Sequence, residues 1–244
     1  MKAKTTWMAA LITIAALLIA TTGISAEKNV QPQKNAATNP ASNAFGQGFA
    51  DWLRDYWAWS YGGVGPQVQP NNVFFMPVPV PADDAWETKD GKLIGTAQMD
   101  LTVEPGTKLV LGVLSWIGET YDPKLVPPIP DDDPAFFTIA DFLPPNGQVE
   151  VMLDGVPLIN DANLASFYYD PIRFINPLMY AEPTSYGSIG AIFVQGIGVI
   201  IQPMTPGRHT LTLYSWDSWK GLYGDTGVGW FNTWNITVAP PGKK

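Results

Sequence analysis

The sequence contains no cysteine, a single histidine and few basic residues, and each scarcity excludes a class of chemistry. Without cysteine there are no disulfides, thiolate metal sites or cysteine nucleophiles. One histidine excludes a multi-histidine metal centre. Lys and Arg number 14 against 22 Asp and Glu, a formal net charge of -8, so the clustered cations that a nucleic-acid partner requires are lacking. We therefore expect no cofactor and no metal, and leave only a calcium ion open.

Aromatic side chains and turn-forming residues are abundant instead. The 244 residues include 10 Trp, 9 Tyr and 11 Phe among 23 Gly and 23 Pro, a composition that predicts a globular, turn-rich β protein. A chain without disulfides must be stabilised by burying apolar surface, at roughly 25 cal/mol per Å². Most of these rings are therefore expected in a core.

Residues 1–26 have the organisation of a secretory signal peptide. Lys2 and Lys4 precede an apolar run from Trp7 to Ala20, which is shorter than the roughly 20 residues of a membrane-spanning helix. Small and polar residues follow, and we expect cleavage after Ala26. The prediction is a secreted or periplasmic protein with no transmembrane segment after cleavage. An uncleaved membrane anchor is the less favoured alternative.

Three segments are predicted along the chain. A signal peptide occupies 1–26, a disordered linker 27–44 and a single β-sandwich domain 45–240. The linker is assigned because it is polar, with Val30 as its one large apolar residue. The sequence does not predict the oligomeric state.

One amphipathic helix is expected where the domain begins. Five aromatic residues recur there at helical spacing and so share one face: Phe45, Phe49, Trp52, Tyr56 and Trp59. Ser42 or Asn43 is expected to cap the start, and Gly62-Gly63 to end the helix. A helix that covers an open side of a β-sheet is favoured over a helix that binds a membrane or a partner, because the polar face offers one cation, Arg54.

The rest of the chain reads as short strands and turns. Pro105-Gly106 and Pro206-Gly207 each precede an apolar strand that finishes in Ser-Trp, which we interpret as a hairpin-like device used twice, with a type II turn at the first. Asp154-Gly155 is a hairpin turn signal. The alternating prolines of 77–81 fit only a sheet edge or an extended segment outside the sheet. The prediction is a mainly all-β fold: an antiparallel β-sandwich or jelly roll with one N-terminal amphipathic helix.

Three motifs carry a resemblance to a protein group. They are the aromatic helix 51–60, the turn Leu153-Asp154-Gly155-Val156-Pro157-Leu158, and the strand Pro206-Gly207-Arg208-His209-Thr210-Leu211. With them the chain resembles an uncharacterised group of secreted bacterial proteins that have an aromatic N-terminal helix and often contain cysteines. The resemblance implies secretion and a β-sandwich. The group has no established activity, so nothing follows about chemistry.

The segment between Trp216 and Trp230 is the main candidate binding site. Its rings lie among Gly, Asp, Ser and Lys, a composition typical of a surface. Exposed rings beside polar groups can stack on a sugar and orient it. The predicted ligand-binding residues are Trp216, Asp217, Trp219, Tyr223, Asp225 and Trp230. The alternative, that these rings close one end of the core, remains open. Tyr168-Tyr169 with Asp170 and Arg173 is a second candidate surface.

Other polar groups give weaker signals. Asp131-Asp132-Asp133 could supply oxygen ligands to Ca²⁺, but it lacks the spacing of a calcium loop, and a solvated loop is favoured. His209 would have to serve any Ser-His-Asp triad, yet no Gly-x-Ser-x-Gly motif is present, so a structural role is favoured. No catalytic residue is predicted.

These observations favour a non-enzymatic exported protein that binds carbohydrate or another cell-envelope component through aromatic loops. A glycan-acting hydrolase is one alternative, with a carboxylate pair drawn from Glu119, Asp170, Glu182, Asp217 and Asp225. A structural envelope or matrix protein that self-associates is the other. Whether the chain is an enzyme stays open, with the non-enzymatic role preferred.

Overall fold

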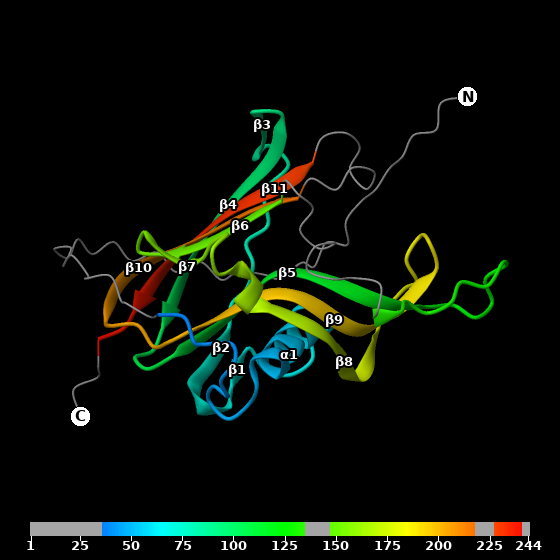
Figure 1. The fold of residues 1–244 in the computed structure, drawn as a ribbon, viewed down its shortest axis with the longest axis horizontal. Helices are drawn as coiled ribbons and strands as arrows, with labels where there is room; N and C mark the ends of the chain where they lie inside the picture. The colour runs from blue at the N-terminus through cyan, green and yellow to red at the C-terminus, as the bar shows by residue number, and fades with distance from the viewer. Residues whose placement is uncertain (1–35, 135–146, 218–226, 241–244) are drawn as a thin grey trace.

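The computed structural model describes residues 36–134, 147–217 and 227–240, whose strands form two sheets (Figure 1). In this described part the five-stranded sheet has the order β1-β2-β5-β9-β8 and the six-stranded sheet the order β3-β4-β11-β10-β6-β7. The α-helix found among the described residues, α1 at Phe49–Gly62, precedes them. The strands are β1 Val68–Gln69, β2 Val73–Phe75, β3 Trp86–Lys89, β4 Lys92–Val103, β5 Lys108–Tyr121, β6 Gln148–Leu153, β7 Val156–Ile159, β8 Tyr168–Met179, β9 Ser188–Ile201, β10 Gly207–Asp217 and β11 Val228–Val238. The predicted all-β, two-sheet fold with an N-terminal helix is confirmed.

Two strand pairs are parallel, which the sequence did not predict. β2 pairs in parallel with β5, and β4 pairs in parallel with β11 from Leu93↔Val228 to Val103↔Val238. The other strand pairs in the described residues are antiparallel. Parallel partners are far apart in the chain, so no local turn announces them. β11 therefore lies inside the six-stranded sheet, between β4 and β10.

Each of the two Pro-Gly turns connects strands of different sheets and closes no hairpin, so the hairpin interpretation was wrong. β4 belongs to the six-stranded sheet and β5 to the five-stranded one, and β9 and β10 are divided in the same way. Each turn thus carries the chain from one sheet to the other. The type II turn itself is confirmed in form at Gly106, whose φ of 80° is the left-handed value that this turn requires at its third residue. Asp154-Gly155 does close the β6–β7 hairpin, as predicted.

Helix α1 covers the outer face of the five-stranded sheet (Figure 1). Two register partners in that sheet, Gly112 on β5 and Gly198 on β9, lie under it. A Cβ at Gly112 would stand 2.4 Å from the Trp57 ring, and one at Gly198 would stand 2.3 Å from Leu53. The paired glycines therefore make the hollow that admits the helix, and the role of a sheet-covering helix is confirmed.

The start of the helix differs from the prediction, whereas its end agrees. Phe45 lies before the helix, with a left-handed φ of 56°, and the N-cap is Gly48, without a capping side chain. Ser42 and Asn43 therefore do not cap it. Gly63 ends the helix in the left-handed conformation, as the Gly-Gly pair predicted. No helix among the described residues has the length and apolar character needed to cross a bilayer.

Residues 36–44 belong to the folded unit. Ala36, Thr38 and Ala44 are buried. The Thr38 N–H donates to the Ile200 carbonyl at 2.8 Å, and the Gln202 N–H donates to the Ala36 carbonyl at 2.7 Å, so this segment continues the sheet beside the end of β9. The part of the predicted linker that the structure describes is thus packed, and the predicted domain boundary at residue 45 differs from the structure.

The proline-rich segment 76–81 is a third connection between the sheets and forms no strand. The Tyr56 hydroxyl donates to the Met76 carbonyl at 2.9 Å, and the Trp234 indole N–H donates to the Pro77 carbonyl at 2.8 Å. One donor belongs to the helix and the other to β11. The fully buried rings of Tyr56 and Trp234 therefore satisfy backbone carbonyls that lack partners in a sheet.

Candidate functional site

The predicted aromatic segment is only partly described. Trp219, Tyr223 and Asp225 lie outside the described residues. Trp216 pairs with Gly229, and Ser215 pairs with Trp230, across β10 and β11. Because successive side chains alternate between the faces of a sheet, Trp216 and Trp230 project from opposite faces of the six-stranded sheet. The structure does not bring these two rings onto one surface. The backbone of Asp217 pairs with Val228.

The two tryptophans have different surroundings. Trp216 is 5% exposed and lies beneath the Lys92 ammonium, whose Nζ is 4.8 Å from the ring centroid. Trp230 is half-buried and meets Trp86 edge to face at 6.3 Å between centroids. Trp86 in turn lies on Gly95, where a Cβ would come within 2.9 Å of its ring. Trp86 and Trp230 therefore form a partly open aromatic pair, whereas Trp216 is covered.

A second polar and aromatic group lies at the end of the five-stranded sheet where β5 finishes and β9 begins, which we call the far end of this sheet. We call Glu119, Tyr121, Tyr180 and Tyr186 the Tyr–Glu cluster. The hydroxyls of Tyr180 and Tyr186 both donate to Oε1 of Glu119, at 3.0 and 3.1 Å. These residues come from the end of β5 and from the connection between β8 and β9, which the sheet register places side by side. Tyr186 is 46% exposed, so its ring is open to solvent.

Asp131 and Asp132 fasten a loop to this cluster. The Thr120 hydroxyl donates to Asp131 Oδ1 at 2.7 Å, and the Glu119 N–H donates to Asp132 Oδ2 at 2.9 Å. The Asp132 N–H returns a bond to the Glu119 carbonyl at 2.9 Å. The solvated-loop interpretation is therefore incomplete, since two of the three carboxylates bind back onto β5. In the described parts of the chain, no set of three or more His, Cys, Asp or Glu residues could hold a metal ion.

The tyrosine hydroxyls of the cluster stay protonated at neutral pH. Burial, with the negative charges of Asp132 and Glu119, raises the pKa of Tyr121 to about 12. Burial and the Glu119 charge also raise the pKa of Tyr180 and that of Tyr186 above the ordinary value of 10.0. The hydroxyls of Tyr180 and Tyr186 therefore remain donors to Glu119.

His209 has a structural setting. Its buried ring places Nδ1 2.7 Å from Asp154 Oδ2 and Nε2 2.8 Å from the Thr205 carbonyl. The other oxygen of Asp154 accepts the Thr210 N–H at 2.8 Å. Both ring nitrogens are thus engaged, and neither is left to exchange a proton with a substrate. The interaction ties the β6–β7 turn to the connection between β9 and β10.

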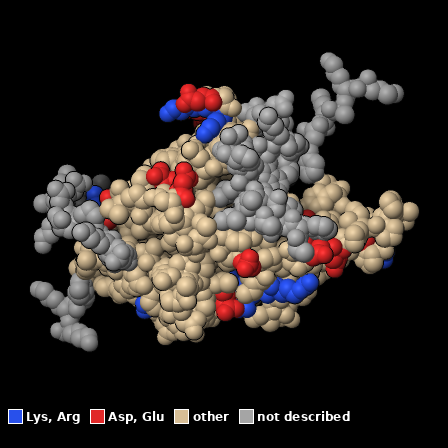
Figure 2. Space-filling model, in the orientation of Figure 1, with Lys and Arg blue, Asp and Glu red and all other residues tan. Residues whose placement is uncertain are grey.

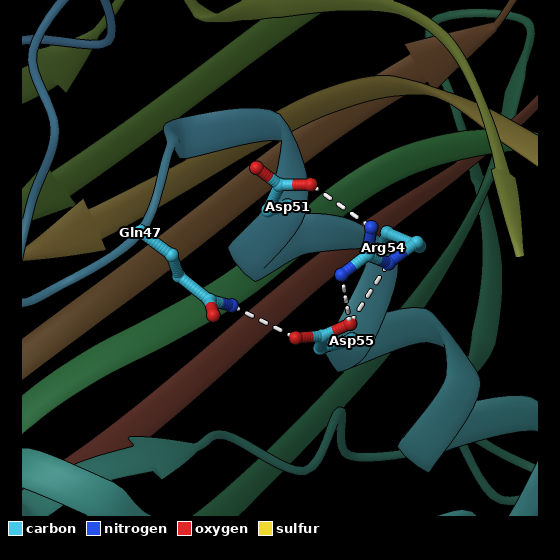
Figure 3. Close-up of polar contacts among 4 residues, drawn as sticks. All are labelled: Gln47, Asp51, Arg54 and Asp55. Atoms are coloured by element: carbon cyan, nitrogen blue, oxygen red, sulfur yellow. Dashed lines mark hydrogen bonds and ion pairs between the residues drawn. The ribbon is translucent and has the colours of Figure 1, made fainter. Parts of the chain in front are cut away.

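The charged residues on the polar face of helix α1 bind one another (Figure 3). Arg54 lies 2.9 Å from Asp51 and 2.8 Å from Asp55, and the Gln47 amide donates to the second oxygen of Asp55 at 2.8 Å. Asp51 lies in the first turn, where a negative charge interacts favourably with the helix dipole. The one cation of the helix is therefore engaged by its own neighbours, which agrees with a packing role.

Of the carboxylates proposed for a hydrolase, Asp225 lies outside the described residues, and the others come from different elements. Asp170 and Glu182 are exposed on β8 and after it, and Glu119 lies in the Tyr–Glu cluster. Of the second candidate surface, Tyr168 donates to Gln195 Oε1 at 3.3 Å, and Tyr169 is buried. Tyr180 and Tyr186 were missed as site residues. Their meeting with Glu119 depends on strand register, and no sequence spacing signals it.

Comparisons with known proteins add little to this geometry. No protein-family model matches the chain. No curated protein matches it. The solved structure of PbICP-C in complex with falcipain-2 is similar over 59% of this chain and 90% of that chain, with 12% sequence identity and a TM-score of 0.21.

Proposed function

We propose that the chain is an exported, non-enzymatic binding protein that holds a carbohydrate against the Tyr–Glu cluster. The observation that carries the proposal is the convergence of two tyrosine hydroxyls on one oxygen of Glu119, beside the exposed ring of Tyr186. A partly exposed aromatic face provides stacking area for a sugar ring, and fixed polar groups orient it. The cluster combines both.

The polar groups favour a ligand rich in hydroxyl donors. Tyr180 and Tyr186 occupy Oε1 of Glu119, and Oε2 has no hydrogen bond to a described residue. Asp131 and Asp132 are held in place by backbone and hydroxyl donors of β5. Carboxylates that are already positioned accept sugar hydroxyls without a further ordering cost. A phosphate or sulfate ligand would meet repulsion there.

Export rests on the sequence. The basic start, apolar run and small residues of 1–26 support a signal peptide, and secretion is also what the resemblance to the secreted bacterial group implies.

The test is retention of the purified chain on immobilised cellulose, chitin and peptidoglycan. Tyr186→Ala removes the exposed ring, and we expect binding to the retaining matrix to weaken about tenfold, the effect of losing one good stacking contact. Phe231→Ala is the matched control, because Phe231 is 37% exposed on β11, which belongs to the other sheet. Equal losses in both variants, or retention on none of the three matrices, would contradict the proposal.

Two measurements separate the alternative functions. Release of reducing sugar by the wild-type chain that disappears in Glu119→Gln would establish the hydrolase, whereas the proposed binding function predicts no release in either. A sedimentation coefficient that rises with protein concentration would support self-association. The sheets favour the monomer because their edges are blunted: β1, β3 and β7 are short, and β8 has two register shifts.

A further inference from the structure

A proline-rich loop projects from the far end of the five-stranded sheet (Figure 1). It follows β5, and its central residues are Val126-Pro127-Pro128-Ile129-Pro130. Val126 is 95% exposed and Ile129 is 43% exposed, and the three prolines are exposed with them. Adjacent apolar side chains on a projecting loop add nothing to the core, and exposed apolar surface of this kind marks interaction sites.

The loop is anchored at its start. The Asp122 N–H donates to the Gly187 carbonyl at 3.0 Å, and the Leu125 N–H donates to the Asp122 carbonyl at 3.1 Å. Leu125 turns inward and packs so closely on Gly187 that a Cβ there would stand 2.5 Å from it. Leu125 therefore joins the loop to the β8–β9 connection, while Val126 next to it is left in solvent.

The loop is also anchored at its return, through Asp131 and Asp132 as described above. Proline fixes its own φ, so the three prolines further limit the conformations between the two anchors. A loop that is held at both ends and stiffened in the middle loses little conformational freedom when it binds. The exposed side chains are thus presented in advance of binding.

The charge around the loop restricts the partner. Residues 122–134 contain four aspartates, Asp122, Asp131, Asp132 and Asp133, and one lysine, Lys124. Acidic side chains gather near the end of β5 and the start of β9, with a basic patch beside them, whereas most of the visible face is uncharged (Figure 2). An anionic lipid surface would be repelled, and so would a second copy of a chain with a net charge of -8. A complementary partner carries Lys or Arg.

We propose that the loop residues Val126–Pro130 dock into a groove of a second polypeptide that is lined by aromatic side chains and bordered by Lys or Arg. Prolyl rings and short apolar side chains pack on aromatic faces, which is how proline-rich segments are recognised. The aspartates that flank the loop meet the basic border. This contact shares Asp131 and Asp132 with the proposed sugar site, whereas Val126 and Ile129 are not part of the Tyr–Glu cluster, so the two contacts can be tested separately.

The test uses the full chain, produced in its organism of origin, with a photo-crosslinking phenylalanine analogue at position 129. We expect one discrete polypeptide adduct, whose crosslinked peptide contains aromatic residues beside Lys or Arg. Its yield should fall several-fold in about 0.5 M NaCl, where charge attraction is screened. Val126→Asp in the same background should reduce the yield about tenfold, because it puts a charge into an apolar contact. Thermal unfolding checks that this variant is folded.

The matched control places the same analogue at Val80, an 83% exposed valine between two prolines on the connection that leads to β3. The proposal predicts little adduct there. Equal adducts at both positions, no adduct at 129, or an adduct with lipid, glycan or a second copy would overturn it. Loss of sugar retention in Tyr186→Ala with an unchanged adduct at 129 would leave both proposals standing as separate sites.

Discussion

The helix-covered region and the far end of the five-stranded sheet are built in contrasting ways. Under α1, Gly112 and Gly198 leave space for the side chains of Trp57 and Leu53. No charged residue lies between Asp55 and Asp83 in the sequence. At the far end, hydroxyls and carboxylates hold the backbone, and apolar side chains face solvent. The first region therefore contributes more to stability than the second, which is free to present side chains. The Asp154–His209 contact lies outside both regions and serves as a reference for variants within them, which follow from the largest expected effect to the smallest.

Asp154→Ala should be the most damaging change. It leaves the buried His209 ring without its carboxylate and the Thr210 N–H without its acceptor. Two donors lose their acceptor, and leaving a buried donor unpaired costs about 1–3 kcal/mol, so we expect a loss of about 2–4 kcal/mol. Urea unfolding should show a loss of that size, whereas Asp161→Ala, in an exposed turn, should change the free energy of unfolding by less than about 0.5 kcal/mol. A small effect at Asp154 would contradict the structural role of the pair.

Gly198→Ala should destabilise the chain next. The new methyl would press on Leu53, and overpacking of this kind costs about 1–3 kcal/mol. Leu53→Ala makes space for the methyl at its own cost, so the double variant should be more stable than the sum of the two single changes predicts. Additive losses in urea unfolding would mean that the helix does not sit against Gly198.

Removing hydroxyls should separate the two regions directly. Tyr56→Phe leaves the buried Met76 carbonyl without its donor, and we expect a loss of about 1–2 kcal/mol. Tyr180→Phe removes a donor from the partly exposed Glu119, which water can replace, so a loss below about 0.5 kcal/mol is expected. Thermal unfolding of both variants decides the matter. Equal losses would remove the contrast between buried and solvated tyrosines.

The last prediction concerns Tyr121 at the far end and leaves stability at neutral pH unchanged. It is an effect of alkaline pH on the free energy of unfolding. Because the pKa of Tyr121 is raised from 10.0 to about 12, the folded chain holds a proton that the unfolded chain releases in this interval. Its contribution to stability is complete below pH 10 and is lost as the pH rises toward 12. Tyr121→Phe should therefore flatten the decline of unfolding free energy between pH 10 and 12. An unchanged slope would show that Tyr121 titrates normally.

The sequence was informative where one residue determines local geometry. Gly63 ended the helix because glycine adopts a left-handed φ without strain, and Asp154-Gly155 closed a hairpin. The same signal at Asp90-Gly91, which closes β3 on β4, was present and overlooked. Pro105-Gly106 also predicted its turn correctly. A turn sequence cannot state whether its two strands pair with each other or enter different sheets.

The candidate site was less accessible to sequence reasoning. The aromatic segment was chosen for its composition, yet alternation along β10 and β11 places Trp216 and Trp230 on opposite faces. The Tyr–Glu cluster joins residues about sixty positions apart, and its three strand ends meet through bulged pairings of β5, β9 and β8. Bulges shift the register by a residue, and a one-residue shift reverses every side chain beyond it.

The central position of β11 has a consequence for how the chain acquires its structure. β3 and β4 on one side, and β10, β6 and β7 on the other, are joined into one sheet only by residues 228–238. During synthesis β3 and β4 are complete more than a hundred residues before the segment that unites them with β10 is made. Such late, long-range closure is slow, and the half-sheets expose unpaired strand edges in the meantime. The nascent polypeptide therefore depends on being kept apart from its copies until that last strand is made.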